Sequence, residues 1–406
     1  MAIEYRPIEP DRFSEFRGVL GRTFGIDPKE EDKEFVRRVF EFDRSIAAFD
    51  GSEIVGTGGA FSFVMTVPGG SLPTAGVTAV GVKPTHRRRG VLRGMMRHQL
   101  DNVRERGEPL AALWAAESSI YGRFGYGVAV EAVDLSIDRR HTEFAPPVDA
   151  PGSVRLVEQE EAGKLLPVVH DQIAPQVPGF IYRTPEHWQN RYFYDPEHWR
   201  EGFSAWRYAV YEEGGEPLGF VAYRQKSKWE EGHAQGTLRV DELLAVTPDA
   251  YASLWQYCFG IDLVLNIEAD NRPVDEPLPW MLADPRHLRR RTADTIWLRL
   301  VDVAAALAAR RYAAEGRLIL EVSDEFCPWN AGRYELVGGP DGADCVRTDV
   351  EPDITLGVAE LGAVYLGGAT FGPLQWAGRV AGGEEAIRRA DDMFRWHVQP
   401  WCCEDF

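Results

Sequence analysis

The stretch Gly76-Val-Thr-Ala-Val-Gly-Val-Lys-Pro-Thr-His-Arg-Arg-Arg-Gly-Val-Leu-Arg93 decides the fold of this 406-residue chain. Its beginning, Gly76–Val82, is apolar and β-branched, which predicts a buried strand. Its middle, His86–Gly90, is basic and ends on a glycine. The rest opens a helical pattern, so the sequence predicts a strand that enters a helix through a basic turn.

The helix after this turn is predicted over Arg89–Arg106. Its apolar residues recur at helical spacing, and Gly107 stands where a helix would end. These apolar residues are Val91, Leu92, Met95, Met96, Leu100 and Val103. The short apolar run Leu110–Ala115 predicts a second buried strand. Strand, helix and strand in this order predict a parallel βαβ unit of an α/β domain.

The basic turn has the chemistry of a pyrophosphate site. A helix N-terminus offers unpaired backbone N–H groups and the positive end of the helix dipole. Gly90 lets the backbone approach an anion without a Cβ atom in the way. Arg88, Arg89 and Arg93 add positive charge and fork-shaped donors. Two blander interpretations stay open, a solvated basic helix start and a nucleic-acid patch.

Composition narrows the ligand class. The formal net charge is −18, which disfavours nucleic acid and favours cationic partners, although such a surplus also serves solubility. The patterns Gly-x-Gly-x-x-Gly and Gly-x-x-x-x-Gly-Lys-Ser/Thr are absent, which disfavours a nicotinamide dinucleotide or a nucleoside triphosphate. No membrane span or signal pattern is evident, so we expect a cytoplasmic protein. The five cysteines form no ligand cluster, and we expect reduced thiols and no metal.

A family resemblance rests on two motifs. The pattern Arg87-x-x-Gly90, after an apolar strand, resembles the acetyl-CoA signature of the GCN5-related N-acetyltransferases, although Leu92 stands where that signature has a small residue. Together with Glu117-Ser-Ser-Ile-Tyr-Gly-Arg-Phe-Gly-Tyr-Gly127, the run Pro84–Leu92 resembles the enhanced intracellular survival family of actinobacterial acetyltransferases. The likeness covers the whole chain, the N-terminal part by motif and the rest by layout.

The resemblance implies an acetyl-CoA site at the strand and the turn. The strand backbone is expected to pair with the pantetheine arm, the turn to hold the pyrophosphate, and the end of the next strand to lie beside the cofactor. The implied residues are Val80, Gly81, Val82, Arg88, Arg89, Gly90, Val91, Leu92, Arg93, Ala116 and Glu117.

Acetyl transfer to an amine needs an acid for the departing thiolate. A tyrosine, with a pKa of about 10, is well matched to a thiol. Tyr121 follows the strand Leu110–Ala115 on the side where parallel sheets bind ligands, and the resemblance assigns it as the general acid. A packed core tyrosine is the plain alternative, and Tyr126 is the rival candidate.

The base is less evident from side chains. His86 belongs to the turn and His98 to the helix. The resemblance implies that the α-carboxylate of Phe406 takes the amine proton, through a water or after partial desolvation. A disordered terminus is the general default, but the aromatic residues of the tail argue against it. For the acceptor we name Asp27 and Asp405, with a solvated surface as the equal alternative.

Proline-rich stretches divide the chain into three segments. They are 144–153 and 270–279, the second continuing toward Pro285. Val240–Val246 followed by Ala250–Phe259 echoes the strand and helix of the first segment without its arginines, which suggests a duplicated fold. Further helices are predicted at 12–24, 30–42, 301–312, 354–366, 372–380 and 384–394, and further strands at 45–49, 54–67, 317–322, 334–337 and 343–347.

The predicted fold class is thus α/β and α+β. With the resemblance, the three segments are a catalytic acetyltransferase domain over 1–148, a degenerate acetyltransferase-like domain over 149–288 and a sterol-carrier-like domain over 289–406. The resemblance implies a homohexamer that acetylates aminoglycosides and other polycationic amines by direct attack. The alternatives are an acetyltransferase for protein lysines or another small amine, and a lipid carrier with a CoA-sensing domain.

Overall fold

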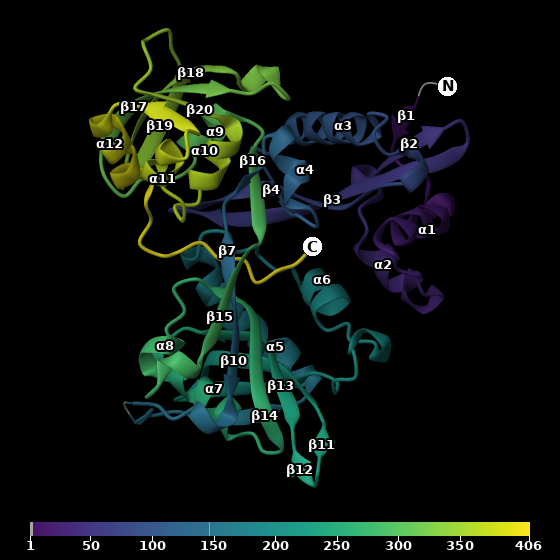
Figure 1. Ribbon diagram of the computed structural model, residues 1–406, viewed down its shortest axis with the longest axis vertical. Coiled ribbons are helices and arrows are strands. Elements are labelled where there is room, and N and C mark those ends of the chain that lie inside the picture. The colour runs from purple at the N-terminus through teal and green to yellow at the C-terminus, as the bar shows by residue number, and fades with distance from the viewer. Residues whose placement is uncertain (1–2, 146) are drawn as a thin grey trace. The chain divides into compact units, whose positions relative to one another are not determined.

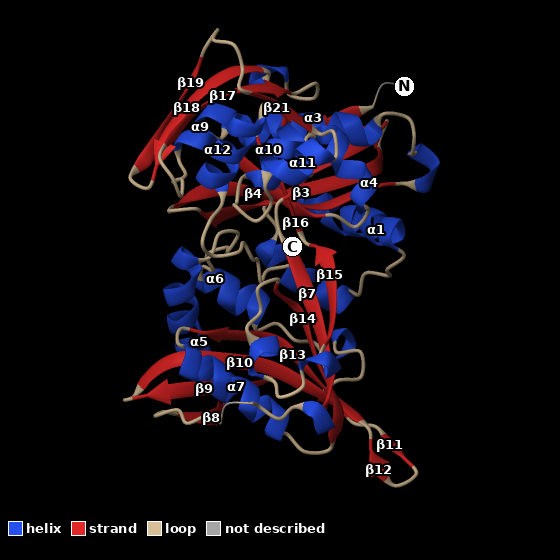
Figure 2. Ribbon diagram, turned by 60° about the vertical axis from the view of Figure 1, so that its left-hand side comes forward, coloured by secondary structure: helices blue, strands red, loops and turns tan. Residues whose placement is uncertain are grey.

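The computed structural model describes residues 3–145 and 147–406, which form two compact units (Figure 1). One unit joins the chain up to Val130 with Asp294–Phe406, and the other is Glu131–Ala293. Helices lie against the strands in each unit (Figure 2). Among the described helices, none is long and apolar enough to span a bilayer.

The first unit is built on a mixed sheet with the order β1-β2-β3-β4-β5-β16-β6. Its strands are β1 (Glu4–Arg6), β2 (Ile46–Asp50), β3 (Glu53–Val67), β4 (Gly70–Val82), β5 (Leu110–Trp114), β16 (Ile296–Leu300) and β6 (Gly127–Val128). Strands β4 and β5 are parallel and the other pairs antiparallel. The predicted strands at 45–49, 54–67, 76–82 and 110–115 are confirmed to within a few residues, except that β4 begins six residues earlier.

Helix α3 (Val91–Glu105) connects β4 to β5 and confirms the predicted βαβ unit. It buries Val91, Met95, Met96, Leu100 and Val103, which is the apolar stripe expected from the sequence. The other helices of this part are α1 (Phe13–Phe24), α2 (Lys33–Val39) and the short α4 (Ser118–Tyr121). Helix α2 ends three residues before the predicted end.

The C-terminal part of this unit carries its own sheet, with the order β19-β18-β17-β20-β21. The strands are β17 (Gly316–Ser323), β18 (Gly332–Gly339), β19 (Gly342–Arg347), β20 (Ile354–Gly357) and β21 (Val380–Gly382). The helices are α9 (Val303–Ala308), α10 (Val358–Val364), α11 (Phe371–Trp376) and α12 (Glu384–Phe394). Helix α12 matches the predicted 384–394.

Three helix predictions in this part were wrong at their ends. Residues 354–357 form a strand because Ile354 and Leu356 are buried while Thr355 between them is exposed, which is the period of a strand. The predicted helix 372–380 stops at Trp376, and Val380 opens a strand instead. The predicted helix 301–312 shortens to Val303–Ala308.

The second unit repeats the mixed sheet, with the order β15-β7-β14-β13-β10-β9-β8. Its strands are β8 (Ser153–Val157), β9 (Arg207–Glu213), β10 (Glu216–Lys226), β13 (Gly236–Ala245), β14 (Val264–Pro273), β7 (Glu131–Asp138) and β15 (Arg289–Asp294), with a small β11 (Trp229–Glu230) and β12 (His233–Ala234) hairpin. The helices are α5 (Gln159–Ile173), α6 (Pro185–His187), α7 (Pro248–Gly260) and α8 (Leu278–Met281). Strands β13 and β14 run parallel with α7 between them, so the predicted echo of the first βαβ unit is confirmed.

Sheet membership departs from the predicted segments at two places. Strand β7, expected in the first segment, pairs with β14 in the second sheet. Strand β16, expected in the third segment, pairs with β5 in the first sheet. The predicted linker 270–279 was wrong at its start, because Asp270–Pro273 complete β14, where Pro273 ends the strand and breaks no interior ladder.

Candidate active site

Strands β4 and β5 separate halfway along β4. They pair only at Thr74–Leu110, Ala75–Ala111 and Gly76–Ala112, and β4 then continues to Val82 without β5. Ala79, with φ of 55°, marks a bulge where the register with β3 shifts. On its β5 side the stretch Val80–Val82 therefore has no strand partner among the described residues. An extended ligand can add to this edge through backbone hydrogen bonds.

The turn that follows is shaped as an anion cradle. Arg88 (φ 61°) and Gly90 (φ 83°) both have left-handed backbone, a pattern that turns successive N–H groups toward one point. Gly90 directly precedes α3, and no side chain caps the first turn of that helix. A Cβ atom at Gly90 would meet nothing within 4 Å. The glycine is thus favoured by its backbone conformation, and the space that it leaves for an anion stays a prediction.

The arginines of the turn differ in what holds them. Arg88 and Arg89 are exposed, and Arg89 lies 3.9 Å from Asp50. The guanidinium of Arg93 lies over the ring of Phe326, 5.2 Å from its centroid. His86 is buried and bonded to Asp50 at 3.3 Å, so it braces the turn from inside. Two exposed guanidinium groups therefore stand beside uncapped backbone amides, which together suit a diphosphate.

Tyr121 ends α4, next to the gap between β4 and β5. It is 7% exposed and belongs to a buried cluster against which Val80 and Leu92 pack. Burial raises the pKa of the Tyr121 phenol above its ordinary value of about 10. The phenol therefore stays protonated at neutral pH, as a proton donor must.

The rival Tyr126 is placed differently. Its ring lies 6.0 Å from that of Tyr121, but the residue is 0% exposed. Its hydroxyl is buried without a hydrogen-bond partner among the described residues, and burial raises its pKa further. An amine or a thiolate cannot reach this group without core rearrangement, so the structure favours Tyr121.

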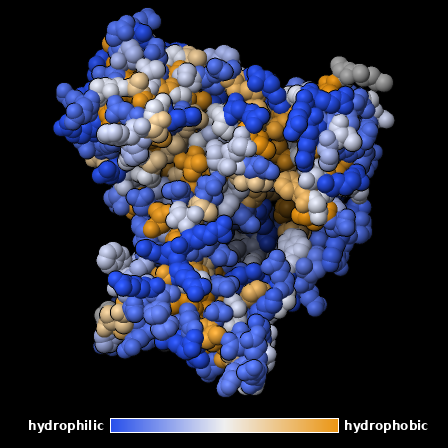
Figure 3. Space-filling model, viewed as in Figure 1, coloured by the Kyte–Doolittle hydropathy of each residue, from blue (hydrophilic) through white to orange (hydrophobic). Residues whose placement is uncertain are grey.

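Ala116 and Glu117 lie in the exposed link between β5 and α4, as predicted for residues beside the cofactor. Figure 3 shows hydrophobic side chains gathered around α4, in the region between α3 and β3. Apolar surface next to exposed arginines is the mixture that a ligand with an apolar arm and a charged head requires.

The C-terminal tail is ordered against the first sheet. Trp401, Cys402 and Glu404 are buried. The indole of Trp114, the last residue of β5, donates to the backbone oxygen of Glu404 at 2.8 Å. The ring of Phe406 meets that of Phe63 on β3, with centroids 5.0 Å apart. The expectation of an anchored tail is met, and both anchoring residues were missed in the sequence.

Comparison with known proteins decides the family. Profiles of the acetyltransferase (GNAT) domain match residues 4–129 and 179–300, and that of the sterol carrier protein domain matches 303–403. The chain is 41% identical to an N-acetyltransferase of Streptomyces avermitilis over the full length of both. It is 38% identical to the N-acetyltransferase Eis of Mycobacterium tuberculosis over 85% of this chain and 84% of that one. The crystal structure of Eis1 from Mycobacterium abscessus superposes with a TM-score of 0.86 at 34% identity, covering 99% and 100% of the two chains.

The chain belongs to the Eis family of N-acetyltransferases. It is therefore an acetyltransferase with two GNAT-type domains and a sterol-carrier-like domain, and GNAT enzymes use acetyl-CoA. These findings confirm the predicted fold class and the predicted enzyme class.

The two residues that we predicted to bind the acceptor in this Eis-family enzyme lie at the surface. Asp27 is exposed in the loop after α1, and Asp405 is exposed in the tail. Thr23, near the end of α1, packs against Gly81 of β4, where a Cβ atom would lie 3.0 Å from its methyl group. The loop that carries Asp27 thus starts beside the strand edge where the donor is expected.

A further contact that the sequence did not reveal comes from the third segment. The loop after β17 places Phe326 and Trp329 against α3, where Arg97 lies over Phe326 and Arg104 over Trp329. Arg97 also donates to the carbonyl of Phe326. The sterol-carrier-like part therefore braces the helix whose N-terminus forms the cradle.

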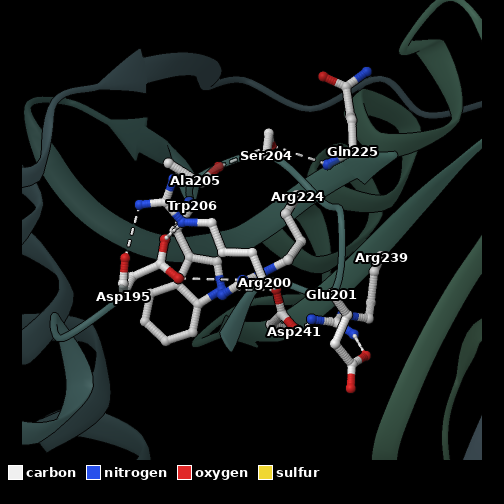
Figure 4. A network of polar contacts seen from close by, with 10 residues as sticks. All are labelled: Asp195, Arg200, Glu201, Ser204, Ala205, Trp206, Arg224, Gln225, Arg239 and Asp241. Atoms are coloured by element: carbon white, nitrogen blue, oxygen red, sulfur yellow. Dashed lines mark hydrogen bonds and ion pairs between the residues drawn. The ribbon is translucent and has the colours of Figure 1, made fainter. Parts of the chain in front are cut away.

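The second GNAT domain has a filled polar interior (Figure 4). Arg224 donates to Asp241 at 2.9 Å and to Asp195 at 3.2 Å, and the indole of Trp206 donates to Asp241 at 2.8 Å. Burial raises the pKa of Asp241, and the neighbouring arginines oppose that rise. Each of these groups already has its partner, which identifies the network as an internal tie of the segment 195–206 to the sheet.

Proposed function

We propose that this enzyme transfers the acetyl group of acetyl-CoA directly to amines of polycationic acceptors such as aminoglycosides, at one or more positions. The proposal places the reaction at the gap between β4 and β5, with Tyr121 as general acid and the Phe406 carboxylate as general base. The observation that carries it concerns the stretch Val80–Val82 and the helix that follows. On its β5 side this stretch has no strand partner among the described residues, and it leads into the N-terminus of α3, which has arginines beside it and no capping side chain among the described residues.

The site fits the donor along its length. The edge Val80–Val82 offers peptide groups to the pantetheine arm, which carries amides of its own. The turn Arg88–Arg93 offers amides, the dipole of α3 and guanidinium groups to the pyrophosphate. Ala116 and Glu117 border the space where the thioester would lie. Acetyl-CoA supplies the activated acetyl group.

The chain's own groups then move two protons. The Tyr121 hydroxyl gives a proton to the departing thiolate sulfur, a role that suits a phenol whose pKa burial has raised. The Phe406 carboxylate takes the proton that the amine nitrogen must lose. A carboxylate is a weak base in water, so this role calls for a bridging water or for partial desolvation by the bound acceptor. None of the cysteines lies in the turn, so a direct attack is favoured over a cysteine-bound acetyl group.

Charge supports a cationic acceptor. The chain carries a net charge of −18, and Asp27 and Asp405 are exposed on the loop and tail that flank the site. Clefts with an excess of one charge attract ligands of the opposite charge and speed their arrival. An aminoglycoside carries several ammonium groups on a polar ring scaffold and fits this field.

We retain the homohexamer as part of the proposal. Trp280 and Trp376 are 89% and 93% exposed, and tryptophans in such positions are common anchors of protein interfaces. The third segment is proposed as a scaffold for the tail, because a charged side chain and three aromatic rings pack together in its core. Arg310 is buried there against the rings of Tyr312, Tyr365 and Phe394 and donates to the carbonyls of Tyr365 and Phe394, at the ends of two helices.

The test is a CoA-release assay with aminoglycosides, spermidine, a lysine peptide and a monoamine. We expect turnover that rises with the number of amines, and mass spectrometry of the products counts the acetylated positions. A preference for the peptide or the monoamine would select the alternative acceptors. Lipid retained on purification with no amine turned over would support the lipid carrier and refute the proposal.

A further inference from the structure

We propose that Trp114 is the positioning residue of the active site, holding the C-terminal tail so that the Phe406 carboxylate meets the acceptor amine. This inference rests on the proposed role of Phe406 as base. Its own observation is the hydrogen bond from the Trp114 indole to the backbone of Glu404, two residues before that carboxylate.

Trp114 is well placed to act as a fixed point. It is the last residue of β5, and its backbone pairs with Ile296 of β16. The last parallel pair of β4 and β5 is Gly76–Ala112, so Trp114 stands two residues beyond the point where the strands part. A side chain on the end of a central strand is held more precisely than one on a loop.

The tail meets this fixed point with its main chain. The Trp114 Nε1 atom lies 2.8 Å from the Glu404 oxygen, and the Cys402 Sγ atom lies 3.4 Å from the same oxygen. Glu404 is 6% exposed and Cys402 is 0% exposed, so the bond is sheltered from water. A sheltered hydrogen bond to a carbonyl fixes both the position and the orientation of the peptide that carries it.

A second contact holds the far end of the tail. The Phe406 ring packs edge-on against Phe63, 5.0 Å away. Phe63 in turn lies over Gly76, where a Cβ atom would come within 2.2 Å of the ring, so only glycine admits it. Contacts at Glu404 and at Phe406 thus hold the tail on both sides of Asp405. Two residues span at most about 7 Å, which keeps the carboxylate close to the indole.

The role must be indirect. An indole N–H donates a hydrogen bond but does not ionise near neutral pH, so Trp114 cannot itself be the acid or the base. Loss of the bond should let the Phe406 carboxylate move and should lower the rate of the chemical step. The strand edge Val80–Val82 and the phosphate cradle should keep their geometry. The expected signature is a change in kcat with the KM for acetyl-CoA preserved.

The experiment compares full-length variants with spermidine as the probe acceptor. Trp114→Phe keeps a ring and removes the donor, and we expect kcat to fall by roughly fivefold to tenfold, as for a lost hydrogen bond, with KM for acetyl-CoA within about twofold. Trp206→Phe is the matched control, because its indole also donates a hydrogen bond, to Asp241 in the second unit, at 2.8 Å. Its kcat should stay at the wild-type value.

A double-mutant cycle with the Phe406 deletion separates positioning from packing. If Trp114 acts through the carboxylate, Trp114→Phe has no further effect on kcat once Phe406 is removed. If the fold-losses of kcat in the two single variants multiply in the double variant, the proposal is overturned. A deletion that leaves kcat unchanged would instead refute Phe406 as base. A slow deletion variant beside a fully active Trp114→Phe enzyme would refute only the positioning role.

Should Trp114→Phe fail to fold, benzothienylalanine at position 114 replaces it. This analogue keeps the bicyclic ring and lacks only the N–H donor, so the same loss of kcat is expected. Wild-type kcat in the analogue enzyme would overturn the proposal.

Discussion

In each GNAT-type domain a strand leads into a helix through a turn that we call the joint: β4 into α3 in the first domain, and β13 into α7 in the second. Among the described residues, the backbone amides at the start of the helix are uncapped in the first joint and capped by a side chain in the second. In the first domain, Arg88 and Gly90 adopt left-handed backbone before α3, and none of the described side chains caps the helix. In the second, the Thr247 hydroxyl accepts from the backbone N–H of Ala250 at 3.2 Å. An amide that already has a partner is not available to a phosphate, so a single cap changes what the joint can bind.

The strands that lead into the two joints differ in the same sense. Beyond Gly76–Ala112 no described strand pairs with the edge of β4 that faces β5. In the second domain Arg272 donates to the carbonyl of Leu243 on β13 at 2.8 Å and pairs with Glu276 at 3.2 Å. A protein side chain thus occupies the edge where the first domain can accept a ligand. The cavity of about 670 Å³ at the start of α7 is lined by Asp149 and Asp249, whose charges oppose a pyrophosphate.

The largest effect is expected from Tyr121→Phe. If only the first domain is competent, removal of its acid should lower kcat by about 10²–10⁴-fold, with no second site to compensate. Tyr126→Phe is the control, since the Tyr126 hydroxyl is buried without a partner, and kcat should be kept. Residual turnover near the wild-type rate in Tyr121→Phe would break the comparison.

The pH profile sharpens the same assignment. Burial raises the Tyr121 pKa, so the donor keeps its proton up to pH values above about 10. We expect kcat to hold through pH 10 and to fall only above it, and the fall to disappear in Tyr121→Phe. An alkaline fall near pH 8 that persists in the variant would identify another group.

Arg272→Met tests whether the second edge is sealed by a structural ion pair. Removing one partner of this buried pair leaves Glu276 unpaired and should lower the unfolding free energy of the second unit by about 3–5 kcal/mol. Urea unfolding followed by tryptophan fluorescence measures it. Arg140→Met, which breaks the exposed pair with Asp138, should cost less than about 1 kcal/mol.

The phosphate cradle is tested by Arg88→Gln combined with Arg89→Gln. We expect the KM for acetyl-CoA to rise at least about tenfold with kcat nearly unchanged, because two charge-assisted contacts to phosphate are lost. Arg388→Gln, at an exposed position of α12, should leave KM unaltered. Equal KM values in the double variant and the wild type would contradict the cradle.

The smallest effect is expected from Thr247→Ala. Loss of the cap should cost about 1 kcal/mol in the stability of the second unit, and Thr247→Ser should restore it. Neither change should alter the KM for acetyl-CoA or create a second binding event in titration calorimetry. Two acetyl-CoA molecules bound per chain would show that the cap alone had closed the second joint.

Many of the helices and strands could be predicted from short stretches of the sequence. The period of the apolar residues in 91–103 located α3, and the β-branched run at 76–82 located the end of β4. The helix predicted at 384–394 matches α12. Local patterns failed where a strand serves a distant sheet. Residues 270–273 appear in sequence as a linker because Asp, Asn and Pro are poor strand formers, yet they continue β14 beside β7.

Sequence by itself determined the family, the βαβ unit and the basic turn, because these depend on residues close together in the chain. Only the tertiary structure decided that β4 and β5 part after Gly76, that Arg272 seals the second edge, and that Trp114 meets Glu404. These contacts join residues up to 290 positions apart, and the partner of a side chain at such a distance is chosen by packing, which no local pattern records.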